Sequence, residues 1–124
     1  MVRRIAAVLA AAIMVLVGAV SPAAAAPVMI SFWRAIDVDG SNLTLAVYDD
    51  GWTYSLDDDT SVCGGGLAKV YGPGVLDDAG NLLAADWTVS CASGPLVGPF
   101  QVKFSPFRRG TMIDSTGVVW FRFG

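Results

Sequence analysis

Clusters of acidic side chains are the features of this sequence that come closest to a site for chemistry. All 11 acidic residues are Asp, and the turn at 37–42 carries four oxygen-bearing side chains. Ca²⁺ binds such oxygen clusters, although this turn does not match an EF-hand loop, which has Gly at its sixth position and Glu at its twelfth. Asp37, Asp39 and Asn42 are therefore the metal candidates, with the run at 57–59 as a second acidic cluster. We interpret both clusters as solvated turns and expect no cofactor.

The same side chains offer little for catalysis. Acyl transfer needs a nucleophile and a base, and the sequence contains no His. Neither Lys69 nor Lys103 lies in a recognisable Ser–Lys motif. Two Asp carboxyls could in principle hydrolyse a glycoside, but the Asp residues fall in turns or on wet strand faces, with Asp86 as the exception. We expect a non-enzymatic domain and keep an Asp-dependent hydrolase as the last alternative.

Aromatic side chains are the second group that could bind a partner. Surface rings can hold a sugar by stacking, whereas in a small domain Trp more commonly fills the core. Trp52 and Trp87 alternate in step with aliphatic residues, so we expect them in the core. Trp33 and Trp120 alternate in step with polar residues and are the candidates for an exposed binding surface. A closed sheet would bring the first and last strands side by side and join the two rings into one platform.

One cationic loop stands out on this acidic chain. Arg108 and Arg109 follow Phe107 and precede Gly110. Such a loop could dock a partner protein or act as the bait loop of a small protease inhibitor. No Cys flanks the pair to fix such a loop, so we keep Arg108 and Arg109 as binding-surface candidates and the inhibitor as an alternative.

Residues 1–25 have the order of a cleavable signal peptide. Arg3 and Arg4 precede an uncharged apolar run at 5–20, and small alanine residues follow it. The run is shorter than the roughly 18–20 residues that a spanning helix needs. The sequence therefore predicts cleavage after Ala25, no stable membrane anchor after cleavage, and a secreted, extracellular or cell-envelope protein.

Residues 26–124 are expected to form a single domain. They hold six Lys and Arg against 11 Asp, a net charge of −5. Such a charge excludes nucleic acid, because phosphate neutralisation needs clustered cations, and it equally disfavours an anionic membrane. Outside the cytoplasm, an even count of two cysteines indicates a disulfide between Cys63 and Cys91.

Apolar and polar residues alternate with period two along this domain, and helix formers are scarce. Both observations favour strands. Short Gly-, Asn- and Asp-rich turns separate the runs, so sequence neighbours should pair. Up to eight strands are predicted, at 28–36, 43–49, 52–57, 67–75, 82–91, 97–104, 111–114 and 118–123.

The predicted fold is all-β: an antiparallel meander of about seven to eight short strands, closed by one disulfide, in a small barrel or a sandwich. The sequence leaves those two architectures open. A hollow barrel would indicate a small apolar ligand, and a filled one would indicate surface binding. In either case we expect a binding or interaction module whose partner is an extracellular protein or glycan.

Overall fold

The computed structural model describes residues 26–124, and the predicted signal peptide lies outside the described residues. The chain folds as a closed, eight-stranded antiparallel barrel in strand order β1 to β8. The all-β prediction is confirmed, and of the two architectures the barrel is the one formed. No helix in this part of the chain is long and apolar enough to cross a membrane. The strands are β1 (Met29–Ile36), β2 (Asn42–Tyr48), β3 (Trp52–Asp57), β4 (Ala68–Leu76), β5 (Leu82–Cys91), β6 (Leu96–Pro106), β7 (Thr111–Asp114) and β8 (Val119–Arg122).

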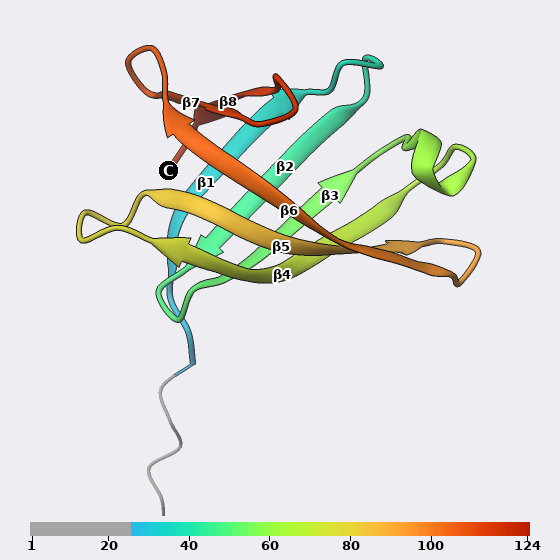
Figure 1. The fold of residues 1–124 in the computed structure, drawn as a ribbon, viewed down its shortest axis with the longest axis horizontal. Coiled ribbons are helices and arrows are strands. Elements are labelled where there is room, and N and C mark those ends of the chain that lie inside the picture. Colours follow the sequence, from blue (N-terminus) through green and yellow to red (C-terminus); the bar gives the residue numbers. More distant parts are fainter. Residues whose placement is uncertain (1–25) are drawn as a thin grey trace, which may run out of the picture.

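Because successive strands run in opposite directions, the connections collect at two ends of the barrel. We call one end the mouth; it carries the loops at 37–41, 58–67, 92–95 and 115–118. The other end, the base, carries the remaining loops. In Figure 1 the mouth loops lie toward the right of the view and the base loops toward the left.

The wall of the barrel is not equally tall all round. β7 and β8 have four residues each, whereas β6 has 11. β7 pairs only with the last three residues of β6. Beyond them, Lys103 exchanges two hydrogen bonds with Ser115, at 2.8 and 3.1 Å. Within the described residues, the half of β6 nearer the mouth therefore has a strand partner on its β5 side only. The wall is low beside the β7–β8 hairpin, as the short red strands of Figure 1 show.

The predicted disulfide is confirmed between Cys63 and Cys91, with Cα atoms 5.4 Å apart. Cys63 ends a short 3₁₀ helix, η1 (Ser61–Cys63), inside the long β3–β4 loop. Cys91 is the last residue of β5 and is buried. The bond therefore ties the longest mouth loop to the barrel wall.

We expect the double variant Cys63→Ser/Cys91→Ser to lose about 3–4 kcal/mol of unfolding free energy. The bond closes a loop with a sequence separation of 28, and loop-closure entropy gives a figure of that size. Urea denaturation followed by circular dichroism measures the loss. A loss below about 1 kcal/mol would show that the β3–β4 loop gains little from the bond.

The two Trp residues predicted at the surface are buried, and this prediction was wrong. Trp33 is 6% exposed and Trp120 is 1% exposed. The closed meander does pair β1 with β8, but both rings point inward. The polar neighbour that suggested exposure is in fact a buried partner: the Trp33 indole N–H donates to Ser31 Oγ at 2.9 Å.

The inward face of β3 is also the reverse of the predicted one. Trp52 is 41% exposed, and on the outer face both it and Tyr54 stack against Tyr71 of β4. Thr53 takes the inward position because the Trp87 ring fills the interior there and donates its indole N–H to Thr53 Oγ1 at 2.8 Å. Trp87 itself is in the core, as predicted.

Candidate ligand-binding site

A cavity of about 360 Å³ lies inside the mouth half of the barrel. Two indole rings line it, those of Trp87 and Trp120, which meet edge to face with centroids 6.2 Å apart. The low wall beside the β7–β8 hairpin borders it, since Phe100 of β6 and Thr116 of the hairpin turn are both lining residues. The aliphatic lining residues are Leu43, Val62, Val70, Val89, Val102 and Val118.

Hydrogen bonds fix both indole rings. The Trp87 N–H donates to Thr53 Oγ1, and the Thr53 hydroxyl donates in turn to the Gly72 carbonyl at 2.8 Å. A Cβ atom on Gly72 would collide with the Asp86 carbonyl oxygen, so a glycine is required for this close approach of β4 to β5. The Trp120 N–H donates to Asp114 Oδ2 at 2.9 Å. With their polar atoms satisfied, the rings offer the cavity rigid apolar surface.

Asp114, one of two buried carboxylates at the cavity, serves the fold. Its Oδ1 accepts from the Thr116 N–H at 2.8 Å, the Thr116 hydroxyl at 2.6 Å and the Val118 N–H at 3.1 Å. Its Oδ2 accepts from Trp120. Both oxygens are thus engaged in holding the β7–β8 turn and the indole ring.

Asp57, the other buried carboxylate, accepts one hydrogen bond, compared with four at Asp114. It ends β3 facing inward, and its hydrogen-bond donor is the Asp59 N–H at 3.1 Å. Burial raises the pKa of Asp57 above that of an ordinary carboxyl, the bond from Asp59 and the nearby Ser41 hydroxyl oppose this, and the charges of Asp37 and Asp39 raise the pKa further. The charged groups acting on Asp57 are therefore both acids.

We expect the isosteric variant Asp57→Asn to have a higher melting temperature than the parent protein at pH 7. A raised native pKa means that the folded state binds the Asp57 proton more tightly than the unfolded state does. The free energy of unfolding therefore falls as pH rises from the unfolded-state pKa through the folded-state pKa of Asp57. Asn retains an acceptor for the Asp59 N–H and carries no charge. The gain should disappear at pH 3, where the parent carboxyl is protonated in both states. A lower melting temperature at pH 7, measured by circular dichroism, would contradict this assignment.

The other mouth acids differ from Asp57. A hydrogen bond from the Ser41 backbone N–H lowers the pKa of Asp39, and hydrogen bonds from Asn42 lower that of Asp58. The Asn42 side-chain amide donates to Asp58 at 2.9 Å, and Asp37 accepts from the Val38 N–H. These three carboxylates therefore accept hydrogen bonds that stabilise the conformation of the mouth loops. Across residues 26–124, no group of three His, Cys, Asp or Glu side chains is placed to hold a metal.

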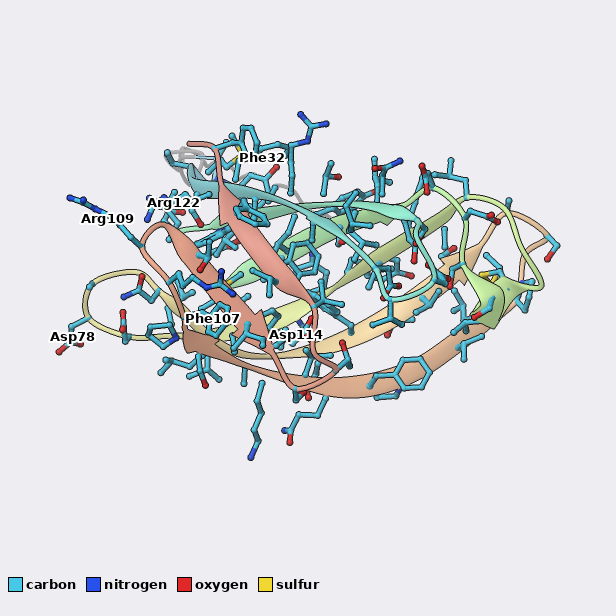
Figure 2. All side chains as sticks on the ribbon, turned by 90° about the horizontal axis from the view of Figure 1, so that it is seen from above. Phe32, Asp78, Phe107, Arg109, Asp114 and Arg122 are labelled. Carbon is cyan, nitrogen blue, oxygen red and sulfur yellow. A yellow bond between two sulfur atoms is a disulfide. The ribbon has the colours of Figure 1, made fainter. Side chains whose placement is uncertain are left out.

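The predicted binding-surface residues are not brought together. Arg108 and Arg109 lie in the base loop between β6 and β7, where the Arg108 guanidinium sits 4.7 Å from the Phe107 ring centroid. Figure 2 shows Arg109 projecting from the same end of the barrel as Asp78. Trp33 and Trp120 are inside the barrel. Sequence reasoning missed the cavity and the inward position of Asp57, which no local pattern marks.

Comparisons with protein-family models, with curated proteins and with solved structures find no match to this chain. What the structure offers is an apolar cavity preformed by hydrogen-bonded rings, with one largely unengaged carboxylate at its edge. Cavities of this kind, with a few convergent polar groups, are where proteins bind small molecules.

Proposed function

We propose that this protein binds a small, largely apolar molecule in the cavity at the mouth of the barrel. The observation that carries the proposal is the cavity itself, about 360 Å³ and lined by two fixed indole rings and aliphatic side chains. Ligand sites measure about 300–1,000 Å³, and an apolar cavity of about 150 Å³ holds benzene. There is room for a molecule of roughly two to three rings or a medium alkyl chain.

Binding without turnover suits the side chains at the cavity better than hydrolysis does. Hydrolysis of a glycoside would need two carboxyls free to act on the substrate. Asp114 is committed to four hydrogen bonds in the fold. The third acid that lines the cavity, Asp37, accepts the Val38 N–H within its own loop, so it is engaged by the fold as well. Asp86 is exposed, and it is not among the residues that line the cavity.

The site of action we propose is outside the cytoplasm, in the cell envelope or the medium. The signal-peptide pattern at 1–25 supports export, and the Cys63–Cys91 bond fits an oxidising compartment. A carrier or scavenger of a small molecule in that compartment is the role we infer.

A second candidate function is glycan binding on the outer face of the barrel. The exposed rings of Trp52 and Tyr54 each stack on Tyr71, with centroids 6.3 and 6.4 Å apart. Exposed aromatic rings are the groups that hold sugars by stacking. These three outer-face rings therefore replace Trp33 and Trp120 as the candidate sugar-binding surface. The rings pack against one another, however, which leaves less free ring face for a sugar than the cavity offers an apolar ligand.

The direct test is titration with N-phenyl-1-naphthylamine, a neutral fluorophore that brightens in apolar sites. The variant Val70→Phe places a ring in the cavity and should weaken binding at least tenfold. Val75→Phe makes the same change on the exposed part of the same strand and should leave binding unchanged. Circular dichroism checks that both variants fold. An absence of binding by the parent protein, or equal binding by Val70→Phe, would refute the proposal.

A further inference from the structure

We propose that the ligand is an organic cation, a molecule with an apolar body and an ammonium group that lies against Asp57 at the edge of the cavity. This inference rests on the proposed function and names the class of molecule that the same cavity takes. The apolar body would lie on the indole rings of Trp87 and Trp120, and the charged end would face the β1–β2 loop.

The first observation is uncompensated negative charge at the cavity. Asp57 is inward-facing and buried, and Asp37 lines the same space. The charges that act on Asp57 come from Asp37 and Asp39. The four mouth loops contain four Asp and no Lys or Arg. A buried carboxylate is ordinarily paired with a cation or fully hydrogen-bonded. A bound organic cation would therefore provide Asp57 with the positively charged partner that the mouth loops lack.

The second observation is independent of charge. Ser41 is 6% exposed, and its hydroxyl oxygen is the one buried side-chain polar atom in the described residues with no hydrogen-bond partner. This hydroxyl influences the pKa of both Asp39 and Asp57 although its geometry falls short of a hydrogen bond; it reaches the site through Asp57, because Ser41 itself is not among the residues that line the cavity. Buried polar atoms are rarely left unpaired. An ammonium group has three N–H donors and no acceptor, so it can donate to a carboxylate and a hydroxyl together.

Other ligand chemistries fit these groups less well. An anion would meet Asp57 and Asp37 without a compensating cation. A metal ion is best held by three converging acidic, His or Cys side chains, and the described residues contain no such group. A neutral alcohol could satisfy one acceptor but would leave the charge of Asp57 unpaired. The aromatic lining favours a cation further, because the face of an indole ring attracts positive charge.

Three probes of the same shape separate charge from shape: 4-phenylbutylamine, 4-phenylbutan-1-ol and 4-phenylbutyrate. Titration calorimetry at pH 7 and low salt should show the amine binding at least tenfold more tightly than the alcohol, and the carboxylate binding most weakly. Asp57→Asn should bring the amine to the affinity of the alcohol. Asp78→Asn removes the same charge at the base of the barrel (Figure 2) and should preserve the preference.

The pH dependence gives a second readout. The acids that act on Asp57 are Asp37 and Asp39 from the β1–β2 loop, and Asp114 of β7 lines the same cavity. The preference for the amine should decline as pH falls and the Asp57 carboxyl, whose pKa is raised by burial, takes up a proton, while the alcohol should bind as before. Displacement of the amine by Ca²⁺ at matched ionic strength would assign the acids to a metal and overturn the proposal.

Two failures remain distinguishable. Equal binding of the amine and the alcohol by the parent protein, with both lost in Val70→Phe, would overturn the organic cation and leave the cavity proposal standing. No binding of any of the three probes, or of the naphthylamine, would overturn both.

Discussion

Replacing Trp120 with Ala is expected to lower the free energy of unfolding by about 5 kcal/mol, the upper end of the range for a buried Trp. The side chain is 1% exposed and packs edge to face against Trp87. Its loss would open a large void at the cavity and remove the indole donor from Asp114. Guanidinium denaturation measures the change, and the milder variant Trp120→Phe keeps it measurable if the Ala variant does not fold.

The matched control is Trp52→Ala on the outer face. Trp52 is 41% exposed and contacts Tyr71, so we expect a loss of about 1 kcal/mol, in line with one stacked pair. Equal losses at the two positions, or a larger loss at Trp52, would contradict the inside–outside assignment of the barrel.

The second large effect is expected at Asp114, where substitution by Ala should cost about 4 kcal/mol. The carboxylate accepts four hydrogen bonds, each contributing about 1 kcal/mol net, and its removal leaves buried donors unpaired. The β7–β8 turn and the orientation of the Trp120 ring depend on these bonds. Urea denaturation at neutral pH is the appropriate measurement.

Thr116→Val provides the control for Asp114. It removes the hydroxyl donor but keeps the Thr116 N–H bond, so the loss should be about 1 kcal/mol. A loss at Asp114 no larger than that at Thr116 would mean that the carboxylate does not organise the turn.

Much of the barrel could be predicted because strand formation is a local property. Period-two alternation predicts the strands, short turns predict neighbour pairing, and the cysteine count predicts the bond between Cys63 and Cys91. These features need no knowledge of what lies across the core. The closure of β1 on β8 follows from the same meander.

The choice of inner face could not be predicted in the same way for β3 and β8. Inside a narrow barrel, large and small side chains must alternate between facing strands. Thr53 is inside because Trp87 reaches it from β5, and Trp120 is inside because Asp114 accepts its N–H. Trp87 is distant from Thr53 in the sequence, and Asp114 is separated from Trp120 by a turn. The alternation within a single strand carries no information about such partners, so it assigns Trp52 and Trp120 to the wrong faces.

The cavity was also beyond prediction, because it is a property of several elements together. It depends on the short β7 and β8 and on the inward Asp57 at the end of β3. In the sequence, Asp57, Asp58 and Asp59 form one acidic run that is typical of a solvated turn. The structure separates them, since Asp57 is the last inward residue of a strand and Asp58 already belongs to the loop.

The central claim is that a small molecule binds inside the mouth of the barrel, and the indole N–H signals test it most directly. The four Trp residues give four separate signals in a ¹⁵N–¹H correlation spectrum. Trp87 and Trp120 line the cavity, whereas Trp33 does not and Trp52 lies on the outer face. Titration with 4-phenylbutylamine should shift the Trp87 and Trp120 signals together, in a saturable manner, and leave Trp52 in place. Saturable shifts confined to Trp52, or no shift at Trp87 and Trp120 at saturating probe, would contradict the claim.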